Sequence, residues 1–294
     1  MSDWRDERSG VAPIPALIWV VFVASFLFGL GYGVTFLLPP LFKAFGANEA
    51  DVGAVLGVAA IATVVTVLFA GHVADAIGRA RAIGIGGLLL AGVHVGFGLA
   101  SSYGAHLWLH GVLLGIGWGV FYCLSQIMIA LLIPAGERAR YFLISHAFIM
   151  GGIGGGPIIW PLVARFDLPV AWAFSIVAVG TAASAILFFG ISRNLKEGAN
   201  GPSDATSSLT LSAAREVLAS EARYPIIMVG IGACVFSGFH AYQTSLASTA
   251  HVDYSLFFIV YTVTVVFFRT VLASHIEATA LCGLGRPTRR HDGR

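Results

Sequence analysis

The chain has 294 residues, of which 57% are hydrophobic and only 11% are charged. Ordinary soluble domains carry about 25% charged residues, so this composition excludes a typical soluble enzyme or binding domain. The net charge of +2 is small and is not gathered into a basic region, which argues against nucleic acid as a partner. The three cysteines lie far apart with no metal-ligand spacing, so we expect no metal and no cofactor.

Uncharged apolar runs recur along the chain and predict membrane-spanning helices, each of which needs about 20 residues to cross the bilayer. The first run is too long for the apolar part of a cleaved signal peptide, so we expect a retained helix. The run 82–136 must hold two helices, with a Ser- and Gly-containing turn at 101–105. We therefore expect an all-α membrane protein with about eight crossings, at 15–38, 51–73, 82–101, 107–133, 140–163, 169–191, 224–247 and 255–273.

Basic residues predict the orientation of these crossings. Of the 17 lysines and arginines, 14 fall in the N-terminal segment, the C-terminal segment and the alternate loops between them. The opposite side holds two, Lys43 and Arg165, while Arg269 falls inside the last crossing. Because basic residues favour the cytoplasmic side, we expect both termini to be cytoplasmic, in a cell membrane such as the inner membrane of a bacterium.

A change in composition after the sixth crossing divides the chain. Residues 198–208 are rich in Gly, Pro and Ser, which is typical of a flexible linker, and residues 211–218 have the spacing of a short amphipathic surface helix or a solvated loop. The expected organisation is a six-helix half over 1–191, a cytoplasmic linker over 192–223, two helices over 224–273 and a cytoplasmic tail over 274–294.

The loop between the second and third crossings carries an aspartate and two arginines between long uncharged runs. A glycine near the end of the second helix would allow close approach to a neighbour, and a glycine in the turn would permit a tight reversal. The aspartate at the membrane edge needs a cationic or helix N-terminal partner, and the arginines would face anionic lipid. The motif consists of Gly71, Asp75, Gly78, Arg79 and Arg81.

This loop motif resembles that of the major facilitator superfamily, whose members are transporters built from two related six-helix halves. Ala76 stands where the family usually has arginine, which removes one member of the expected charge network. In the fifth crossing, Gly152, Gly156 and Pro157 resemble a glycine-proline motif of the family's antiporters. Close packing beside a proline bend explains these residues equally well.

The resemblance implies a central cavity lined by the first, fourth and seventh helices, with a tenth helix for which this sequence has no segment. Polar residues inside membrane helices are costly and tend to face the bundle interior. Gly111 and Gly115 share a face of the fourth helix with several polar and aromatic side chains; the alternative for each is a packing role. The cavity candidates are Tyr32, Thr35, Trp118, Tyr122, Gln126, His240 and Thr244.

Every carboxylate falls in a predicted loop or at a helix end. If transport is coupled to protons, His94, His110, His146 or His240 must therefore supply the titrating group, since histidine titrates near physiological pH. The alternative is that these histidines are neutral packing residues.

The sequence therefore predicts a secondary carrier that moves a small organic solute by alternating access, and the antiporter-like motif favours efflux as the direction. Two alternatives remain open: an interrupted remnant without transport activity, and a polytopic membrane enzyme or assembly factor. No nucleophile–base spacing favours catalysis. After Ala273 the expected second copy of the loop motif is missing, which predicts an interrupted twelve-helix ancestor; a short carrier completed by homodimerisation is the alternative.

Overall fold

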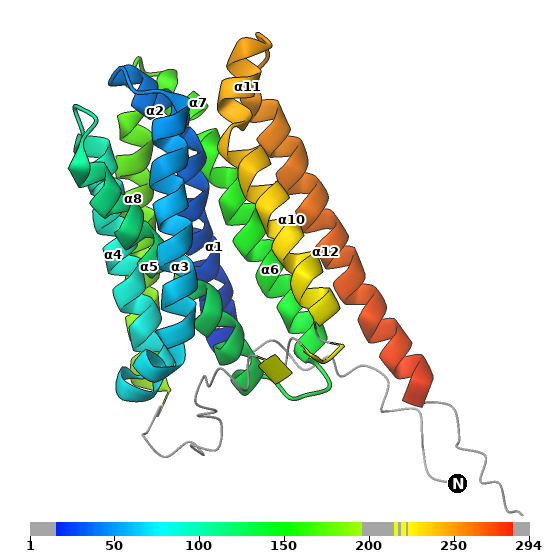
Figure 1. The fold of residues 1–294 in the computed structure, drawn as a ribbon. Helices are drawn as coiled ribbons and strands as arrows, with labels where there is room; N and C mark the ends of the chain where they lie inside the picture. Colours follow the sequence, from blue (N-terminus) through cyan, green and yellow to red (C-terminus); the bar gives the residue numbers. More distant parts are fainter. Residues whose placement is uncertain (1–15, 196–214, 217–218, 222, 285–294) are drawn as a thin grey trace, which may run out of the picture.

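The computed structural model describes residues 16–195, 215–216, 219–221 and 223–284, and the regular elements in these ranges are all helices (Figure 1). This confirms the predicted all-α class. The predicted linker core and most of the predicted surface helix lie outside the described residues. The helices are α1 (Ala16–Val34), η1 (Thr35–Leu37), α2 (Leu38–Ala44), α3 (Glu49–Ile77), α4 (Arg79–Leu99), α5 (Ala105–Leu132), α6 (Arg138–Gly155), η2 (Gly156–Ile158), α7 (Ile159–Ala164), α8 (Ala171–Asn194), α10 (Arg223–Ala241), α11 (Gln243–Thr249) and α12 (Tyr254–Leu284).

Seven stretches of the described chain are long and apolar enough to cross a membrane, which makes this a multi-pass membrane protein. The expected crossing at 224–247 is divided at Tyr242 into α10 and α11, and its continuous apolar part is the shorter stretch Ile231–Ala241. The last helix continues to Leu284, so the predicted tail begins as an extension of α12.

The ends of α3 show why the sequence places a helix there. Asn48 Oδ1 accepts hydrogen bonds from the backbone N–H groups of Ala50 (2.8 Å) and Asp51 (3.2 Å), while the Asp51 carboxylate accepts from the Asn48 N–H (2.9 Å). This reciprocal capping box begins α3. Gly78 ends it with φ +90°, a conformation that side chains other than glycine rarely adopt, and α4 begins at the next residue.

Glycines let α1 and α6 lie in backbone contact. A Cβ on Gly29 would lie 2.5 Å from the carbonyl oxygen of Ile149, and a Cβ on Gly156 would lie 2.5 Å from the carbonyl carbon of Gly33. A Cβ on Gly152 would overlap the backbone of α1 in the same way. The hydrophobic effect does not drive helices together inside a bilayer, so close packing must hold them. Small residues at such a seam allow that close packing.

A second glycine seam joins α5 to α3. A Cβ on Gly111 would lie 2.7 Å from the Val55 carbonyl oxygen, and one on Gly119 would lie 3.0 Å from that of Thr63. Gly115, between them, meets the backbone of α3 still more closely. Gly111 and Gly115, which share a helical face with the cavity candidates of the fourth crossing, thus have the packing role that was the alternative for them.

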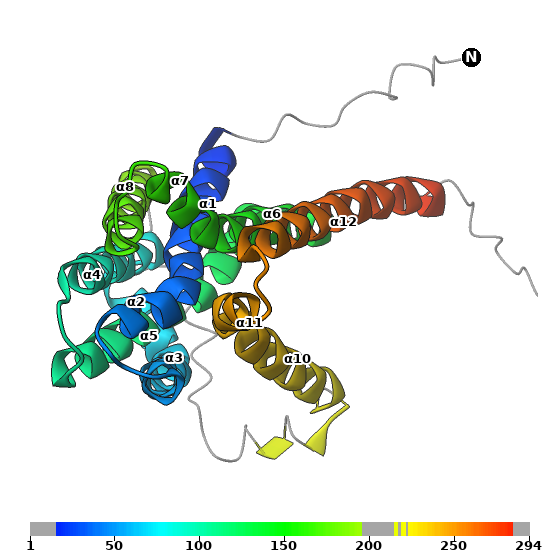
Figure 2. The same cartoon turned by 90° about the horizontal axis from the view of Figure 1, so that it is seen from above.

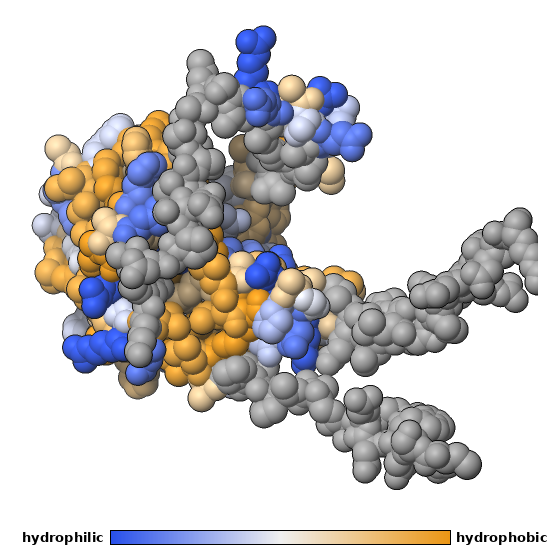
Figure 3. Space-filling view, turned by 90° about the horizontal axis from the view of Figure 1, so that it is seen from below, coloured by the Kyte–Doolittle hydropathy of each residue, from blue (hydrophilic) through white to orange (hydrophobic). Residues whose placement is uncertain are grey.

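The C-terminal helices α10 and α12 lie on the same side of α1 and diverge from each other (Figure 2). Helix α12 lies along α6, where the Tyr261 hydroxyl donates to Met150 Sδ (3.5 Å) and Gly151 accommodates Val266. The second half of α10 contacts η1, where Phe236 lies against Phe36, whereas the first half diverges from the bundle, so that Met228 near its start is 74% exposed. Figure 3, which views the molecule from the end at which α10 diverges, shows apolar side chains over much of the described bundle.

Candidate functional site

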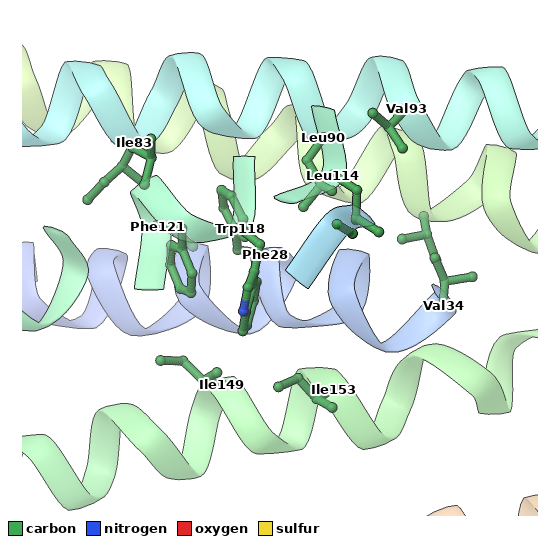
Figure 4. Packing of buried hydrophobic residues seen from close by; sticks show 14 of the residues in the cluster. Phe28, Val34, Ile83, Leu90, Val93, Leu114, Trp118, Phe121, Ile149 and Ile153 are labelled. Carbon is green, nitrogen blue, oxygen red and sulfur yellow. The ribbon is translucent and has the colours of Figure 1, made fainter. Parts of the chain in front are cut away.

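Aromatic rings on α1 and α5 form the centre of the candidate site. Phe28 stacks on Phe121 with centroids 4.1 Å apart, and Tyr32 stacks on Trp118 at 4.2 Å. Figure 4 shows Phe28, Trp118 and Phe121 facing one another between the helices. The structure therefore brings together two of the predicted cavity residues, Tyr32 and Trp118. Offset stacking of this kind adds roughly 0.5–1.5 kcal/mol per pair to the burial of the rings.

The stacked rings of Phe28, Phe121, Tyr32 and Trp118 begin a ring series, which continues onto α10 and α12 around His240. Its imidazole lies 5.5 Å from the Phe36 ring, 4.1 Å from Phe236 and 4.6 Å from Tyr261, measured between centroids. Nδ1 lies 2.8 Å from the Phe236 carbonyl oxygen, while Nε2 is buried without a partner in the described chain. His240 thus joins the first, seventh and eighth crossings at one point.

Thr35 and Thr244 lie at the break between α1 and α2, and the hydroxyl of each donates a hydrogen bond to a backbone carbonyl there. Thr35 Oγ1 donates to the Tyr32 carbonyl (2.6 Å) within its own turn. Thr244 Oγ1 donates to the Phe36 carbonyl (3.2 Å). The usual helical donor to that carbonyl would be residue 40, and Pro40 has no N–H. Thr244 therefore supplies the donor that Pro40 lacks, rather than presenting a free hydroxyl to a solute.

The same arrangement occurs at the break in the fifth crossing. The Pro157 carbonyl would pair with residue 161 in a continuous helix, and Pro161 again lacks an N–H. The Tyr254 hydroxyl at the start of α12 donates to it at 3.5 Å, and its ring stacks on Trp160 at 5.9 Å. Two proline breaks in the six-helix body are thus each satisfied by a hydroxyl from the C-terminal helices.

A further pair of contacts holds α11 against the start of α3. The Ser245 hydroxyl donates to Glu49 Oε1 (2.5 Å), and the Tyr242 hydroxyl donates to the Glu49 carbonyl oxygen (3.4 Å). These contacts lie at the same end of the bundle as the Thr244 bond. The ring series is therefore covered at the α11 end, whereas the first half of α10 stands apart at the other end (Figure 1).

Tyr122 and Gln126 continue the face of α5 toward the end at which α10 stands apart. Tyr122 is 42% exposed, and its ring lies 5.9 Å from Trp118. Gln126 is half-buried, and its Nε2 has no hydrogen-bond partner in the described chain. A buried amide donor without a partner is a site where a ligand or a water molecule would be stabilised.

The family of this chain is shown by its similarity to known proteins. The family model of the Major Facilitator Superfamily matches residues 20–280. The chain belongs to the major facilitator superfamily. No curated protein matches it. Two solved structures of the peptide transporter POT in complex with sulfate, one of them of a variant with a Glu-to-Gln substitution, are similar at TM-score 0.56 and 19% identity, over 78% of this chain and 48% of theirs. The chain thus spans about half the length of these structures.

The superfamily loop motif lies at the junction of α3 and α4, as predicted, but its contacts differ from the expectation. Gly78 provides the positive φ that the reversal requires. A Cβ on Gly71 would meet nothing within 4 Å, so the predicted close approach at Gly71 is wrong. Asp75 is exposed and has no hydrogen bond or ion pair among the described residues, so the cationic or helix N-terminal partner expected for it is not found there.

The superfamily's antiporter-like motif in the fifth crossing has a packing role here. Gly152, Gly156 and Pro157 are all buried, and both glycines contact the α1 backbone. The six-helix body also buries His94, whose Nδ1 lies 3.5 Å from Thr181 Oγ1. These residues belong to the structural core, and none of them faces the aromatic series at its open end.

Sequence reasoning missed one pair of polar residues in the seam between α6 and α12. His146 is half-buried with its Nδ1 unpartnered in the described chain, and the charge of Arg269 acts on it. The signal in the sequence was Arg269 itself, an arginine inside the apolar run of the last crossing. The seam geometry of α6 and α12 could not be derived from either helix alone.

A groove on the outer face of the described chain lies away from the candidate site. This groove of about 610 Å³ runs along α3, α4 and α5, and Thr66 supplies the single polar side chain in its lining. Its apolar lining and its position on the outer face are typical of a surface that contacts lipid. The described residues include no cluster of side chains able to hold a metal ion.

Proposed function

We propose that this chain carries out the transport of a small organic solute as a secondary carrier that works by alternating access. The observation that carries the proposal is the aromatic and polar face shared by α1, α5, α10 and α12, which is covered at the α11 end and stands open at the other. Family membership supports it, because the superfamily's fold places binding sites between its related halves.

The arrangement of contacts supports one state of such a cycle. At the α11 end, three hydrogen bonds that a small rotation would break join α11 and the residue before it to the six-helix body; the donors are the hydroxyls of Tyr242, Thr244 and Ser245. At the other end, α10 makes no comparable contact among the described residues. With the predicted topology, in which both termini are cytoplasmic, this state is open to the cytoplasm. In that topology the six-helix half and the two-helix part are joined by a cytoplasmic linker.

Solute flux into liposomes that contain the purified chain tests the proposal. The uptake of a panel of labelled organic solutes is compared between the wild type and Trp118→Ala, which removes the ring that stacks on Tyr32. The matched control is Trp172→Ala, since Trp172 is half exposed on α8 and away from the ring series. Flux that Trp118→Ala abolishes and Trp172→Ala retains would support the carrier; equal flux in all three, or none, would contradict it.

A further inference from the structure

Away from their ends, the described membrane-spanning stretches carry positive charge and no carboxylate. Their carboxylates are confined to the first or last turn of α3, at Glu49, Asp51 and Asp75. Arg269 is the one lysine or arginine of these stretches that lies more than a turn from either end. An ionisable residue at this depth is costly and normally marks a function. Among the residues that the structure describes, Arg269 forms no hydrogen bond or ion pair.

Helical register places Arg269 on the inner side of the α6–α12 seam. Tyr261 and Arg269 are eight residues apart on α12, so they share a face, and Tyr261 contacts both Met150 of α6 and His240 of α10. His146 lies one turn from Met150 on α6, and Val266, three residues before Arg269 on α12, packs on Gly151 of α6. The packing of the two helices therefore brings Arg269 toward His146, and the Arg269 charge acts on that imidazole. The seam therefore presents an imidazole and a guanidinium together on the side that faces α10.

Gln126 of α5 lies at a similar depth. Phe121 is level with Phe28 of α1, and Ile149 of α6 is level with Gly29. Gln126 lies five residues beyond Phe121, and His146 lies three residues before Ile149. Because α5 runs opposite to α6, both lie toward the open end. Their depths differ by about 4.5 Å at 1.5 Å per residue, since Phe28 and Gly29 are themselves one residue apart on α1. Gln126 Nε2 and His146 Nδ1 are both buried without partners in the described chain.

We propose that Arg269, His146 and Gln126 form the anion subsite of the carrier, and that its substrate is an aromatic organic anion. This inference rests on the proposed function and adds the substrate class. All three side chains can donate hydrogen bonds, and a guanidinium matches the two oxygens of a carboxylate. The aromatic body would lie against Tyr122, one turn from Gln126 on α5, and its neighbour Trp118. A cationic substrate would meet a like charge there.

Calorimetric binding to the purified full chain tests this assignment without transport. The chain is placed in nanodiscs of neutral phosphatidylcholine, and the probes are benzoate, the uncharged analogue benzyl alcohol, and inorganic phosphate as an anion without a ring. We expect benzoate to bind more tightly than the other two. Removal of one hydrogen-bonded charge from a site weakens binding by about tenfold or more, and we expect this loss in Arg269→Gln. His146→Gln should weaken benzoate binding and leave that of benzyl alcohol unchanged.

Arg165→Gln is the matched control, because it removes the same charge from the segment after α7. Arg269→Lys keeps the charge, so it should fold as the wild type does and retain part of the affinity. Benzoate binding that is equal in the wild type and Arg269→Gln would overturn the assignment, as would a wild type that binds no benzoate. Loss of benzoate binding on addition of phosphatidylglycerol would overturn it as well, by showing that a lipid headgroup occupies Arg269. Arg269-dependent binding without flux would contradict the carrier and leave the subsite standing.

Discussion

The seam between α1 and α6 predicts a large difference between two Gly→Ala substitutions. At Gly152 the new Cβ would lie 2.9 Å from the Leu30 backbone nitrogen and 3.0 Å from the Gly29 carbonyl carbon, and it would overlap the Phe26 carbonyl, whereas ordinary contacts begin at 3.4 Å. At Gly92, in the middle of α4, the same Cβ would meet nothing within 4 Å. Backbone atoms cannot rotate away as side chains can, so α1 and α6 must separate in Gly152→Ala.

The difference between the two variants isolates the cost of this separation. Alanine favours a helix over glycine by about 1 kcal/mol at either position, so this contribution cancels. Overpacking costs about 1–3 kcal/mol, and we expect the upper part of this range because the nearest neighbours of Gly152 are backbone atoms. Gly92→Ala should be slightly more stable than the wild type and Gly152→Ala clearly less stable.

Thermal and denaturant unfolding of the purified chain, followed by tryptophan fluorescence, measures both variants under the same conditions. Gly154→Ala provides a graded control, since its Cβ would meet the Thr262 side chain of α12 rather than backbone. It should fall between the other two. Equal stability of Gly152→Ala and Gly92→Ala would refute the argument that α1 and α6 are in backbone contact.

Three further predictions follow from single side chains. Thr244→Val leaves the Phe36 carbonyl without a donor and should destabilise the protein by about 1–3 kcal/mol in unfolding experiments; an unchanged stability would contradict the proline-break argument. Hydrogen bonds from the Ser255 side chain and N–H lower the pKa of Asp253 from its ordinary value of 3.8. The ionised Asp253 carboxylate therefore stabilises the folded protein fully above pH 3.8, and this stabilisation is lost as the pH falls through the lowered pKa. Asp253→Ala should therefore lower Tm at pH 7 and have little effect near pH 2, and an equal effect at both would count against it. Ser203→Cys should resist labelling from outside intact cells, and strong labelling would overturn the predicted topology.

The sequence was sufficient to predict the helices and their order, because uncharged runs and charged loops report directly on a bilayer. It was also sufficient for the turn at Gly78, since a glycine between charges at a helix end has few alternatives. It did not show where the crossings break. The breaks at η1 and η2 depend on hydroxyls from Thr244 and Tyr254, which reach carbonyls about 100 or more positions away along the chain.

The site was predicted less completely because helical periodicity defines faces but not neighbours. Gly115 and Trp118 were predicted to share one environment, yet Gly115 meets the backbone of α3 and Trp118 meets Tyr32 of α1. Arg269 and His146 come together because α12 packs antiparallel to α6, which neither helix reveals alone. Patterns within one helix therefore identified candidate residues, and the packing between helices decided their roles.

A reversible crosslink at the α11 end tests alternating access most directly. The native cysteines are replaced by serine, and Glu49→Cys and Ser245→Cys are combined, because these two side chains meet at 2.5 Å in the covered state. A short bifunctional thiol reagent should then stop solute flux in liposomes, and its reduction should restore it, while the same reagent should have no effect on either single variant. Flux that continues at the full rate in the crosslinked double variant would contradict the account, because a carrier locked at one end cannot alternate.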